Sequence, residues 1–281
     1  MKIIECPRDA MQGFSRFIPT AEKIAYLTLL LKVGFDTLDF GSFVSPKAIP
    51  QLADTQEVLA NLDLTNTNTK LLAIVANQRG AETACQFPEI QYLGYPFSIS
   101  ETFQLRNTNR TIADSVVLVE EMQALCVKNN KELVVYISMG FGNPYGDDWS
   151  VEIAEKWVQK MAEMGIRIVS LADTVGSAEA DSISYLYANL IPRFPAIEFG
   201  AHFHATPEAR ITKLQAAYQQ GCRRFDAAIK GFGGCPFAED DLVGNIATET
   251  LLSFLASENI DLQINKEAFR DALLMSASVF A

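Results

Sequence analysis

The two histidines of this 281-residue chain, His202 and His204, lie in one short segment and are its only imidazole groups. The residues before them, 196–199, are typical of a strand. Side chains at positions i and i+2 of a strand share one face and lie about 7 Å apart along the backbone. Two imidazoles on one face can converge on a single ion, so the pair predicts a metal site. The alternative is a pair of polar residues at a strand end.

A carboxylate is expected to join the two imidazoles. Asp9 follows the first strand-like segment and Asp173 follows the sixth, so either side chain could reach them. Imidazole together with carboxylate suits Mg²⁺, Mn²⁺, Co²⁺ or Fe²⁺ better than it suits a thiolate-preferring ion. Two histidines and one carboxylate also describe the facial triad of non-haem iron enzymes, so the ligands alone leave the reaction open.

A glycine-rich segment, residues 230–236, follows the last strand-like run. Its three glycines allow backbone conformations that other residues avoid, as in a phosphate-binding loop or a mobile flap. Cys235 is poorly placed there for core packing and could deliver a proton or act as a nucleophile. We expect the other cysteines to be small buried hydrophobic residues, and they are Cys6, Cys85, Cys126 and Cys222.

Strand-like and helix-like patterns alternate along the chain, and the strands are too apolar to face water on both sides. This rhythm predicts an α/β fold, a (β/α)₈ TIM barrel forming one domain over residues 1–281 with a C-terminal helical extension. A doubly wound open sheet is the alternative. The strand-like runs are 3–5, 37–40, 71–75, 90–93, 133–137, 168–171, 197–200 and 224–228. The clearest helical patterns are 20–33, 46–60, 111–128, 151–164, 178–190, 207–219 and 248–257.

In such a barrel the active-site residues lie where the strands end and the following loops begin. The unusual polar residues of this chain fall at those positions. They are Arg8, Asp9, Ser42, Asn77, Ser138, Asp173, Thr174, the two histidines and the loop 230–245.

The net charge of -11 argues against nucleic acid or an anionic membrane as the main partner. No apolar stretch approaches the roughly 20 residues of a membrane span, and the first residues lack the pattern of a signal peptide. Five scattered cysteines do not form a disulfide framework. We therefore expect a cytoplasmic protein.

Six segments occur in an order that resembles the hydroxymethylglutaryl-CoA lyases of the DRE-TIM metallolyase superfamily. The Gly-Gly-Cys-Pro loop is the most specific of them, since the related isopropylmalate and homocitrate synthases share the Arg-Asp and His-x-His elements but lack that loop. The resemblance spans nearly the whole chain. The segments are residues 7–12, 42–47, 170–176, 201–204, 231–236 and 244–249.

The resemblance implies a role for each matching residue. The metal ligands would be Asp9, His202, His204 and Asn245, holding Mg²⁺ or Mn²⁺. The catalytic residues would be Arg8 stabilising an enolate, Cys235 as the acid of a closing loop, Asp173 beside the substrate hydroxyl, and Asp39 in the place of a family glutamate. The substrate contacts would be Gln12, Ser42, Ser170 and Thr174. A homodimer and an acyl-CoA substrate are also implied.

The implied reaction cleaves 3-hydroxy-3-methylglutaryl-CoA to acetoacetate and acetyl-CoA, with Asp173 or His202 accepting the hydroxyl proton. Departures from the family pattern concern the substrate. Asp39 is one methylene shorter than glutamate, Ala205 stands where the family usually has aspartate, and residues 239–241 make the last loop acidic. Two alternatives follow: a lyase or aldolase acting on a different hydroxyacyl-CoA or hydroxy acid, and a catalytically silent ligand-binding barrel.

Overall fold

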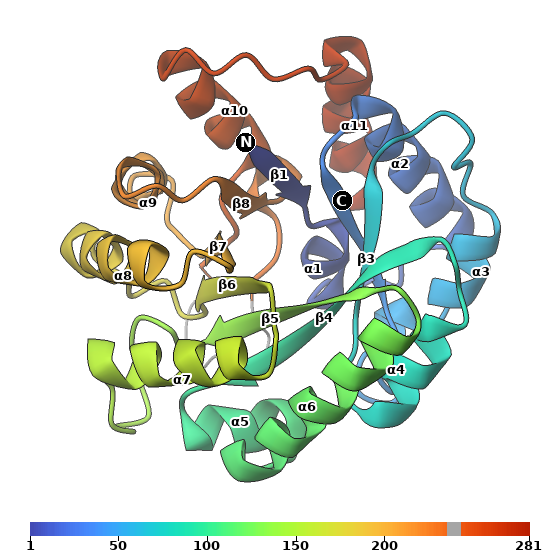
Figure 1. The fold of residues 1–281 in the computed structure, drawn as a ribbon. Helices are drawn as coiled ribbons and strands as arrows, with labels where there is room; N and C mark the ends of the chain where they lie inside the picture. Colours follow the sequence, from blue (N-terminus) through green and yellow to red (C-terminus); the bar gives the residue numbers. More distant parts are fainter. Residues whose placement is uncertain (235–242) are drawn as a thin grey trace.

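Eight parallel strands form a closed barrel in sequence order (Figure 1). The computed structural model describes residues 1–234 and 243–281. Each predicted strand-like run coincides with a barrel strand, although the runs 71–75 and 224–228 extend one residue past the strand end and the run 197–200 begins one residue before the strand, and closure of the sheet rules out the doubly wound alternative. The strands are β1 (Lys2–Glu5), β2 (Thr37–Ser42), β3 (Lys70–Ile74), β4 (Ile90–Ser98), β5 (Glu132–Ser138), β6 (Ile168–Asp173), β7 (Glu198–Phe203) and β8 (Arg224–Ala227).

Helices follow the strands and surround the barrel, as the alternating pattern predicts. One expected helix is wrong: residues 46–60 contain a turn, the 3₁₀ helix η1 (Pro50–Leu52) and only then α3, because Pro50 cannot donate a backbone hydrogen bond inside a helix. The α-helices are α1 (Pro7–Gln12), α2 (Thr20–Val33), α3 (Thr55–Ala60), α4 (Gln78–Cys85), α5 (Glu101–Thr108), α6 (Ile112–Lys128), α7 (Val151–Glu163), α8 (Ala180–Arg193), α9 (Arg210–Gln219), α10 (Thr248–Ser257) and α11 (Lys266–Val279). A second 3₁₀ helix, η2 (Ile229–Gly231), follows β8.

Apolar side chains fill both faces of the strands. A small cluster inside the barrel includes Leu72, Val134 and Tyr136, whereas alternate residues such as Leu71 and Ala73 belong to the larger core beneath the helices. Alternation of this kind places every second side chain inside the barrel. The barrel is therefore a packed core whose free space lies at its ends.

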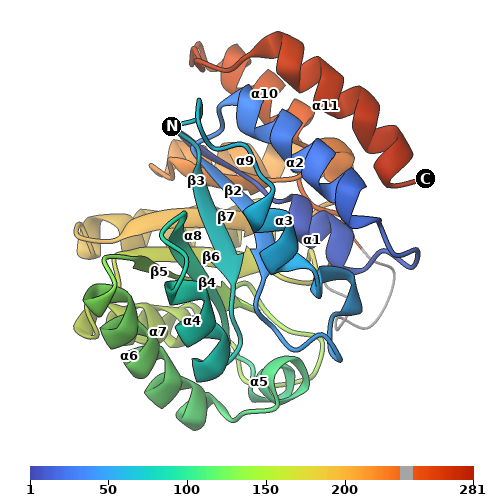
Figure 2. The ribbon, with the colours of Figure 1, turned by 90° about the vertical axis from the view of Figure 1, so that its right-hand side faces the viewer.

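The predicted C-terminal extension is α11, which packs beside α2 (Figure 2). The ring of Phe280, just after α11, meets Tyr26 of α2 edge-on at a centroid distance of 6.0 Å. Phe269 of α11 meets Phe35 in the same way at 6.4 Å. These contacts hold the end of the chain against the outside of the barrel.

A β-bulge interrupts β2 close to its end. Asp39 pairs with Leu72 of β3 and Gly41 pairs with Ala73, so Phe40 is an extra residue in the strand. Gly41 is required there, since a Cβ at this position would lie 2.5 Å from Cγ2 of Thr55. Bulges redirect neighbouring side chains and are common beside active sites.

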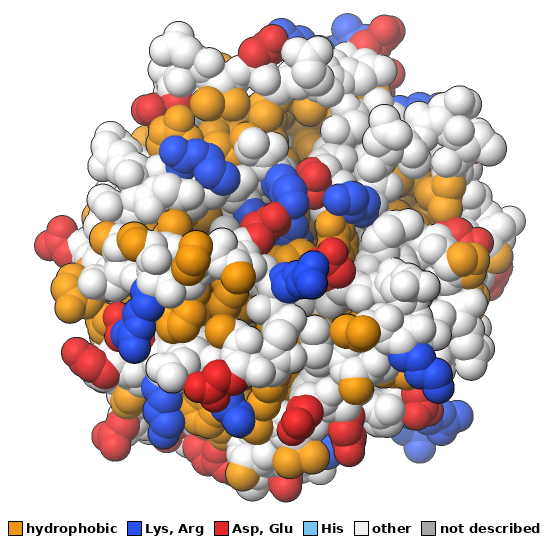
Figure 3. Space-filling model, viewed as in Figure 1, with side chains coloured by type: hydrophobic (Ala, Val, Ile, Leu, Met, Phe, Trp, Pro, Cys, Tyr) orange, Lys and Arg blue, Asp and Glu red, His pale blue; other side chains and the backbone are white. Residues whose placement is uncertain are grey.

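The face shown in Figure 3 mixes acidic and basic side chains, and neither histidine is visible on it. Lys2 and Glu198, at the starts of β1 and β7, form an ion pair at 2.5 Å. His202 is near the end of β7 and His204 directly follows that strand, so both histidines lie at the end of the barrel where the strands terminate. None of the helices in residues 1–234 and 243–281 is long and apolar enough to cross a membrane.

Candidate active site

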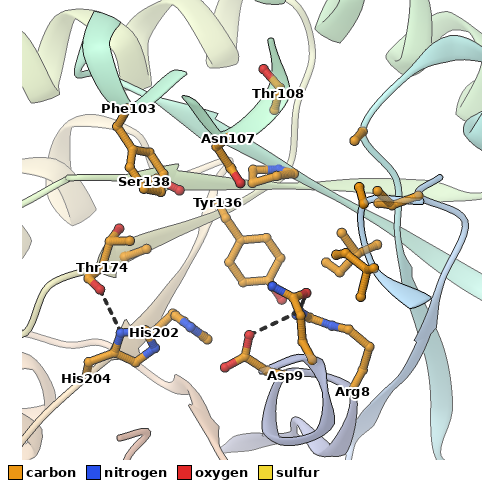
Figure 4. Close-up of a pocket in the computed structure, with 18 residues that line it drawn as sticks. Arg8, Asp9, Phe103, Asn107, Thr108, Tyr136, Ser138, Thr174, His202 and His204 are labelled. Carbon is orange, nitrogen blue, oxygen red and sulfur yellow. Dashed lines mark hydrogen bonds and ion pairs between the residues drawn. The ribbon is translucent and has the colours of Figure 1, made fainter. Parts of the chain in front are cut away.

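Asp9, His202 and His204 come together at the end of the barrel where the strands terminate. Their potential ligand atoms all lie within 4.8 Å of one another. Asp9 is in the first turn of α1, directly after β1, and His202 is in β7. The centroids of the two imidazole rings are 5.2 Å apart, and both rings lie on one side of the pocket with Asp9 (Figure 4). The structure thus brings together both histidines and the nearer of the two candidate carboxylates.

Hydrogen bonds on the far side of each ring determine which nitrogen is free. Nδ1 of His204 lies 2.8 Å from the carbonyl oxygen of Thr174, which can only accept, so this nitrogen donates. Nδ1 of His202 lies 3.0 Å from Oδ2 of Asp226. In its neutral form each ring then presents Nε2 as an acceptor, and among the described residues the buried Nε2 of His204 has no partner. Oriented imidazoles with unpartnered nitrogens beside a carboxylate fit a divalent cation.

The pKa values of the two histidines shift in opposite directions. Burial lowers the pKa of His202, but the hydrogen bond and charge of Asp226 outweigh burial and raise the pKa above its ordinary value. Burial and the neighbouring His202 lower the pKa of His204. The sequence pattern did not point to Asp226, although a charged residue in an apolar strand was a usable signal.

Asp9 is an ionised carboxylate in a buried position. Burial opposes its ionisation, but Arg8, the two histidines and Asn245 outweigh burial and lower its pKa to about 2. Nη1 of Arg8 donates to Asp9 at 3.0 Å, and the amide nitrogen of Asn245 donates at 2.7 Å. The same nitrogen of Asn245 donates to the carbonyl of Phe232 at 2.9 Å. Asn245 therefore reaches the cluster through its amide N–H groups.

Arg8 is held by two carboxylates. Its Nε and Nη2 donate to Oδ2 of Asp39 at 2.9 and 2.6 Å, and its Nη1 also donates to Gln12 at 2.8 Å. Burial disfavours the charged guanidinium, yet Asp39 and Asp9 raise the pKa of Arg8 above its ordinary value. Burial raises the pKa of Asp39 to about 6, so at neutral pH Asp39 is mostly ionised. The guanidinium of Arg8 is therefore a fixed positive charge beside the cluster of Asp9, His202 and His204.

Asp173 lies apart from this cluster. Ala172 and Thr174 line the pocket, whereas Asp173 between them points to the other face. Its Oδ2 accepts from Nζ of the buried Lys213 at 2.6 Å. Lys213 also donates to the carbonyl oxygens of Gly176 and His204, at 2.8 and 3.0 Å. The pair of Asp173 and Lys213 therefore links the loop after β6 to the backbone of His204.

The remaining predicted site residues divide into three groups. Gln12 and Thr174 line the pocket. Ser42 and Ser170 do not: Ser42 donates to the carbonyl of Ile74 at 3.2 Å, and Ser170 is buried with no partner for its hydroxyl in residues 1–234 and 243–281. Cys235 and the acidic residues 239–241 lie outside the described residues.

The pocket has a polar side and an apolar side. Arg8, Asp9 and the two histidines form the polar side, and the ring of Tyr136 stands edge-on to His202 with centroids 5.7 Å apart. The neutral polar residues of the lining are Gln12, Asn107, Thr108, Ser138 and Thr174. The apolar side comes from the ends of β2, β3 and β4 and the loops after them. Its residues are Val44, Ala48, Ile49, Ile74, Ala76 and Pro96. Only Val44 of these residues lies in a segment of the family resemblance, and the sequence had assigned a role to none of them.

Comparison with known proteins identifies lyases that are similar to this chain over most of its length. A hydroxymethylglutaryl-CoA lyase of Bacillus subtilis is 33% identical over 92% of this chain and 85% of its own length. A Pseudomonas aeruginosa protein named 3-hydroxy-3-isohexenylglutaryl-CoA/hydroxy-methylglutaryl-CoA lyase is 30% identical over 95% of this chain and 88% of its own. A solved HMG-CoA lyase of Acinetobacter baumannii, in complex with coenzyme A and 3-methylmalate, superposes with a TM-score of 0.91 at 30% identity, covering 100% of this chain and 91% of that one.

The match extends beyond individual relatives to a whole family. The model of the HMGL-like family matches residues 2–275, which is almost the entire sequence. That span contains every residue of the polar side of the pocket and of its apolar side. The chain belongs to the HMGL-like family.

Proposed function

We propose that the protein is a divalent-metal-dependent carbon–carbon lyase that cleaves a 3-hydroxyacyl-CoA, with 3-hydroxy-3-methylglutaryl-CoA as the first substrate to test. The observation that carries the proposal is the cluster of Asp9, His202 and His204 beside the charged Arg8. Relatives named as lyases of this type, each about 30% identical over most of the chain, support the same reaction.

Asp9, His202 and His204 would hold the ion, and we include Asn245 as a fourth ligand on the strength of the resemblance alone. Its amide oxygen would then have to take the place of the N–H group that faces Asp9. Imidazole and carboxylate donors without a thiolate suit Mg²⁺, Mn²⁺, Co²⁺ or Fe²⁺. The resemblance favours Mg²⁺ or Mn²⁺ among these. When bound, the ion supplies a Lewis acid that lowers the pKa of a substrate hydroxyl.

The reaction is a retro-aldol cleavage. The 3-hydroxyl loses its proton, the C2–C3 bond breaks, and its electron pair passes into the thioester as an enolate while C3 becomes a ketone. The enolate carbon then takes up one proton, giving acetoacetate and acetyl-CoA with no external oxidant or reductant. Arg8, fixed by Asp39, would stabilise the negative charge that develops on the thioester oxygen.

Two residues were candidates to accept the hydroxyl proton. Asp173 is paired with Lys213 on the other face of β6, which counts against it. His202 lines the pocket and is backed by Asp226, which supports it as the acceptor. Cys235 as the acid that protonates the enolate rests on the resemblance alone, as do the substrate contacts Ser42 and Ser170.

The partners and setting complete the proposal. We infer an acyl-CoA substrate, because an HMG-CoA lyase structure similar to this chain is in complex with coenzyme A. On the resemblance alone we extend the proposal to a homodimer and a cytoplasmic location. Light scattering from the purified protein tests the dimer.

The test is release of acetoacetate from 3-hydroxy-3-methylglutaryl-CoA by protein loaded with Mg²⁺ or Mn²⁺. We expect chelation, Asp9→Asn and Cys235→Ala each to remove most of the activity. Asp181→Asn, at an exposed position in α8, is the matched control and should behave as wild type. Turnover that survives chelation or loss of Asp9 would contradict the metal mechanism, and loss of it in the control would show a general effect on folding.

A further inference from the structure

His202 belongs to a second group of potential metal ligands, which includes neither Asp9 nor His204. The group consists of Cys6, Asp226 and His202, and its ligand atoms all lie within 4.8 Å of one another. Nδ1 of His202 is 3.0 Å from Oδ2 of Asp226. The second group therefore meets the ring at Nδ1, whereas Nε2 remains for the cluster of Asp9 and His204.

Closure of the barrel brings the three side chains together. Asp226 and His202 are on the paired strands β8 and β7, and the register of these strands places them side by side. β1 pairs with the other edge of β8. Cys6 directly follows β1, and its amide donates to the carbonyl of Ala227 at 2.8 Å. Backbone pairing of three neighbouring strands therefore positions the group.

Asp226 and Cys6 both have capacity for a further partner. Oδ1 of Asp226 is buried and has no hydrogen-bond partner within residues 1–234 and 243–281. The thiol of Cys6 donates to the carbonyl of Ile4 at 3.6 Å, which is long even for sulfur. A buried carboxylate oxygen that lacks a donor is costly, and a bound cation would satisfy it.

The charges around the thiol also favour a cation. Burial raises the pKa of Cys6 well above its ordinary value, and Asp226, Asp39 and Asp9 raise it further against the opposing effect of Arg8. Carboxylates that disfavour a second negative charge attract a dication by the same electrostatics. Cys6 is therefore a neutral thiol whose proton a metal ion can replace.

We propose that Cys6, Asp226 and His202 form a second metal site, which takes a thiolate-binding ion such as Zn²⁺ and weakens the binding of an ion by Asp9 and His204. Thiolate, imidazole and carboxylate are the donors of zinc sites, whereas the first cluster offers no thiolate. The ion reaches the site from the pocket, which His202 lines. The thiol proton leaves to solvent when the ion binds, so no oxidant or reductant takes part.

The two sites are coupled because they share one imidazole. An ion at Nδ1 replaces the proton that this nitrogen shares with Asp226, and an ion at Nε2 then makes the ring of His202 a bridge between two dications. Like charges on the two sides of one buried ring repel each other strongly. Occupancy of either site should therefore lower the affinity of the other, to the same extent in both directions.

The first test uses Co²⁺ in place of Zn²⁺, because thiolate ligation of Co²⁺ gives a charge-transfer absorption band in the near ultraviolet. Every protein carries Cys235→Ala, so that this thiol cannot supply the ligand. We expect the band in this parent protein and after His204→Gln, which removes a ligand of the first site only, and no band after Cys6→Ser. Cys222→Ser is the matched control, since Cys222 is also 1% exposed and donates to a backbone carbonyl at 3.6 Å.

Three results of the Co²⁺ experiment would overturn the proposal. They are absence of the band from the parent protein, an equal band after Cys6→Ser, and loss of the band after His204→Gln, which would assign the thiolate to the first site. Thermal unfolding checks the fold of each variant, and Cys6→Ala is the second variant if serine destabilises the barrel.

The second test measures affinity and coupling. In the His204→Gln background, calorimetry should show Zn²⁺ affinity falling at least about 100-fold with Cys6→Ser, since even residues outside a ligand set change metal affinity about 10–100-fold. In excess Mn²⁺, the parent should need about 5–150-fold more Co²⁺ than its His204→Gln derivative to reach half of the band. Equal midpoints would contradict the coupling between the sites.

The second site does not depend on the proposed lyase reaction, and the two can fail separately. The Co²⁺ band without release of acetoacetate by wild type would keep the second site and remove the reaction. Release of acetoacetate without the band in the parent protein would do the reverse.

Discussion

Glu5 and Asp9 are four residues apart and both carboxyl groups are buried, but their pKa values are shifted in opposite directions. Burial raises the pKa of Glu5 to about 8, with a smaller contribution from the nearby Glu249. Hydrogen bonds from Thr248 and Ile229 act in the other direction and lower it. Burial acts on Asp9 in the same direction, yet its pKa falls to about 2. Desolvation is common to both sites, so the difference must come from the partners.

The partners of the two groups differ in charge. Glu5 faces α10, where the hydroxyl of Thr248 donates at 2.6 Å and the amide of Ile229 at 2.9 Å. Among the described residues no basic side chain hydrogen-bonds to Glu5. Asp9 faces the pocket, where Arg8 donates to it and two imidazoles lie close by. A buried carboxyl group that is surrounded by cationic or metal-binding groups stays ionised and can bind a metal ion. A buried carboxyl group without such neighbours is neutral and acts as part of the packing.

Asp173 extends the comparison, because it is a third buried carboxylate that depends on a single cation. Lys213→Met would leave it without that cation, and we expect a loss of about 3–5 kcal/mol in the free energy of unfolding. Urea unfolding measures the change. Lys32→Met, at an exposed position in α2, is the control and should be nearly neutral. Equal stability of the two variants would show that Asp173 does not rely on Lys213, and Lys213→Met with Asp173→Leu should recover part of the loss.

Arg8 contributes most to the difference in pKa between Asp9 and Glu5. Arg8→Met removes the guanidinium that stabilises developing negative charge, and we expect kcat to fall about 100–1,000-fold. Steady-state cleavage assays at saturating metal measure the effect. Arg270→Met is the control, since Arg270 is exposed on α11. If Arg8→Met retained most of its kcat, the fixed charge at this site would have a structural role only.

Asp226 orients His202 from behind the ring. Asp226→Asn keeps the size of the side chain but weakens the hydrogen bond to Nδ1, so Mn²⁺ affinity should fall about 10–100-fold. Calorimetric titration of the metal-free protein measures it without reference to turnover. Unchanged affinity would mean that the position of His202 depends on its packing against Tyr136 instead.

Glu5 tests the other half of the comparison. Because its pKa is higher in the folded than in the unfolded state, its contribution to stability is present at acidic pH and declines as pH rises from about 4.5 to about 8. Glu5→Gln mimics the neutral form, so the variant should lack this decline. We expect the Tm difference from wild type to grow by a few degrees per pH unit towards pH 8.

Thermal unfolding at pH 5, 6, 7 and 8 makes the measurement for Glu5→Gln. Glu57→Gln, exposed in α3, is the matched control. Parallel Tm curves for wild type and Glu5→Gln would show that Glu5 is ionised in the folded protein, and the contrast with Asp9 would then be lost.

Periodicity in the sequence predicted nearly the whole fold, because each strand and helix buries a face that its own residues define. The ends of α2 and α10 agree with the expected helices to the residue. The main error was the helix expected over residues 46–60, where proline at position 50 prevents a continuous helix. Part of the site was equally local: the spacing of His202 and His204, and the position of Asp9 directly after a strand.

The sequence by itself determined the barrel, the end of it that carries the site, and the pair of imidazoles, since all three depend on residues that are neighbours in the chain. Only the tertiary structure decided that Asp173 pairs with Lys213 away from the pocket and that Asp226 supports His202. It also decided that three strand ends combine into one apolar wall. The physical reason is that charge and packing depend on distances between segments far apart in sequence, which closure of the barrel fixes and local pattern does not.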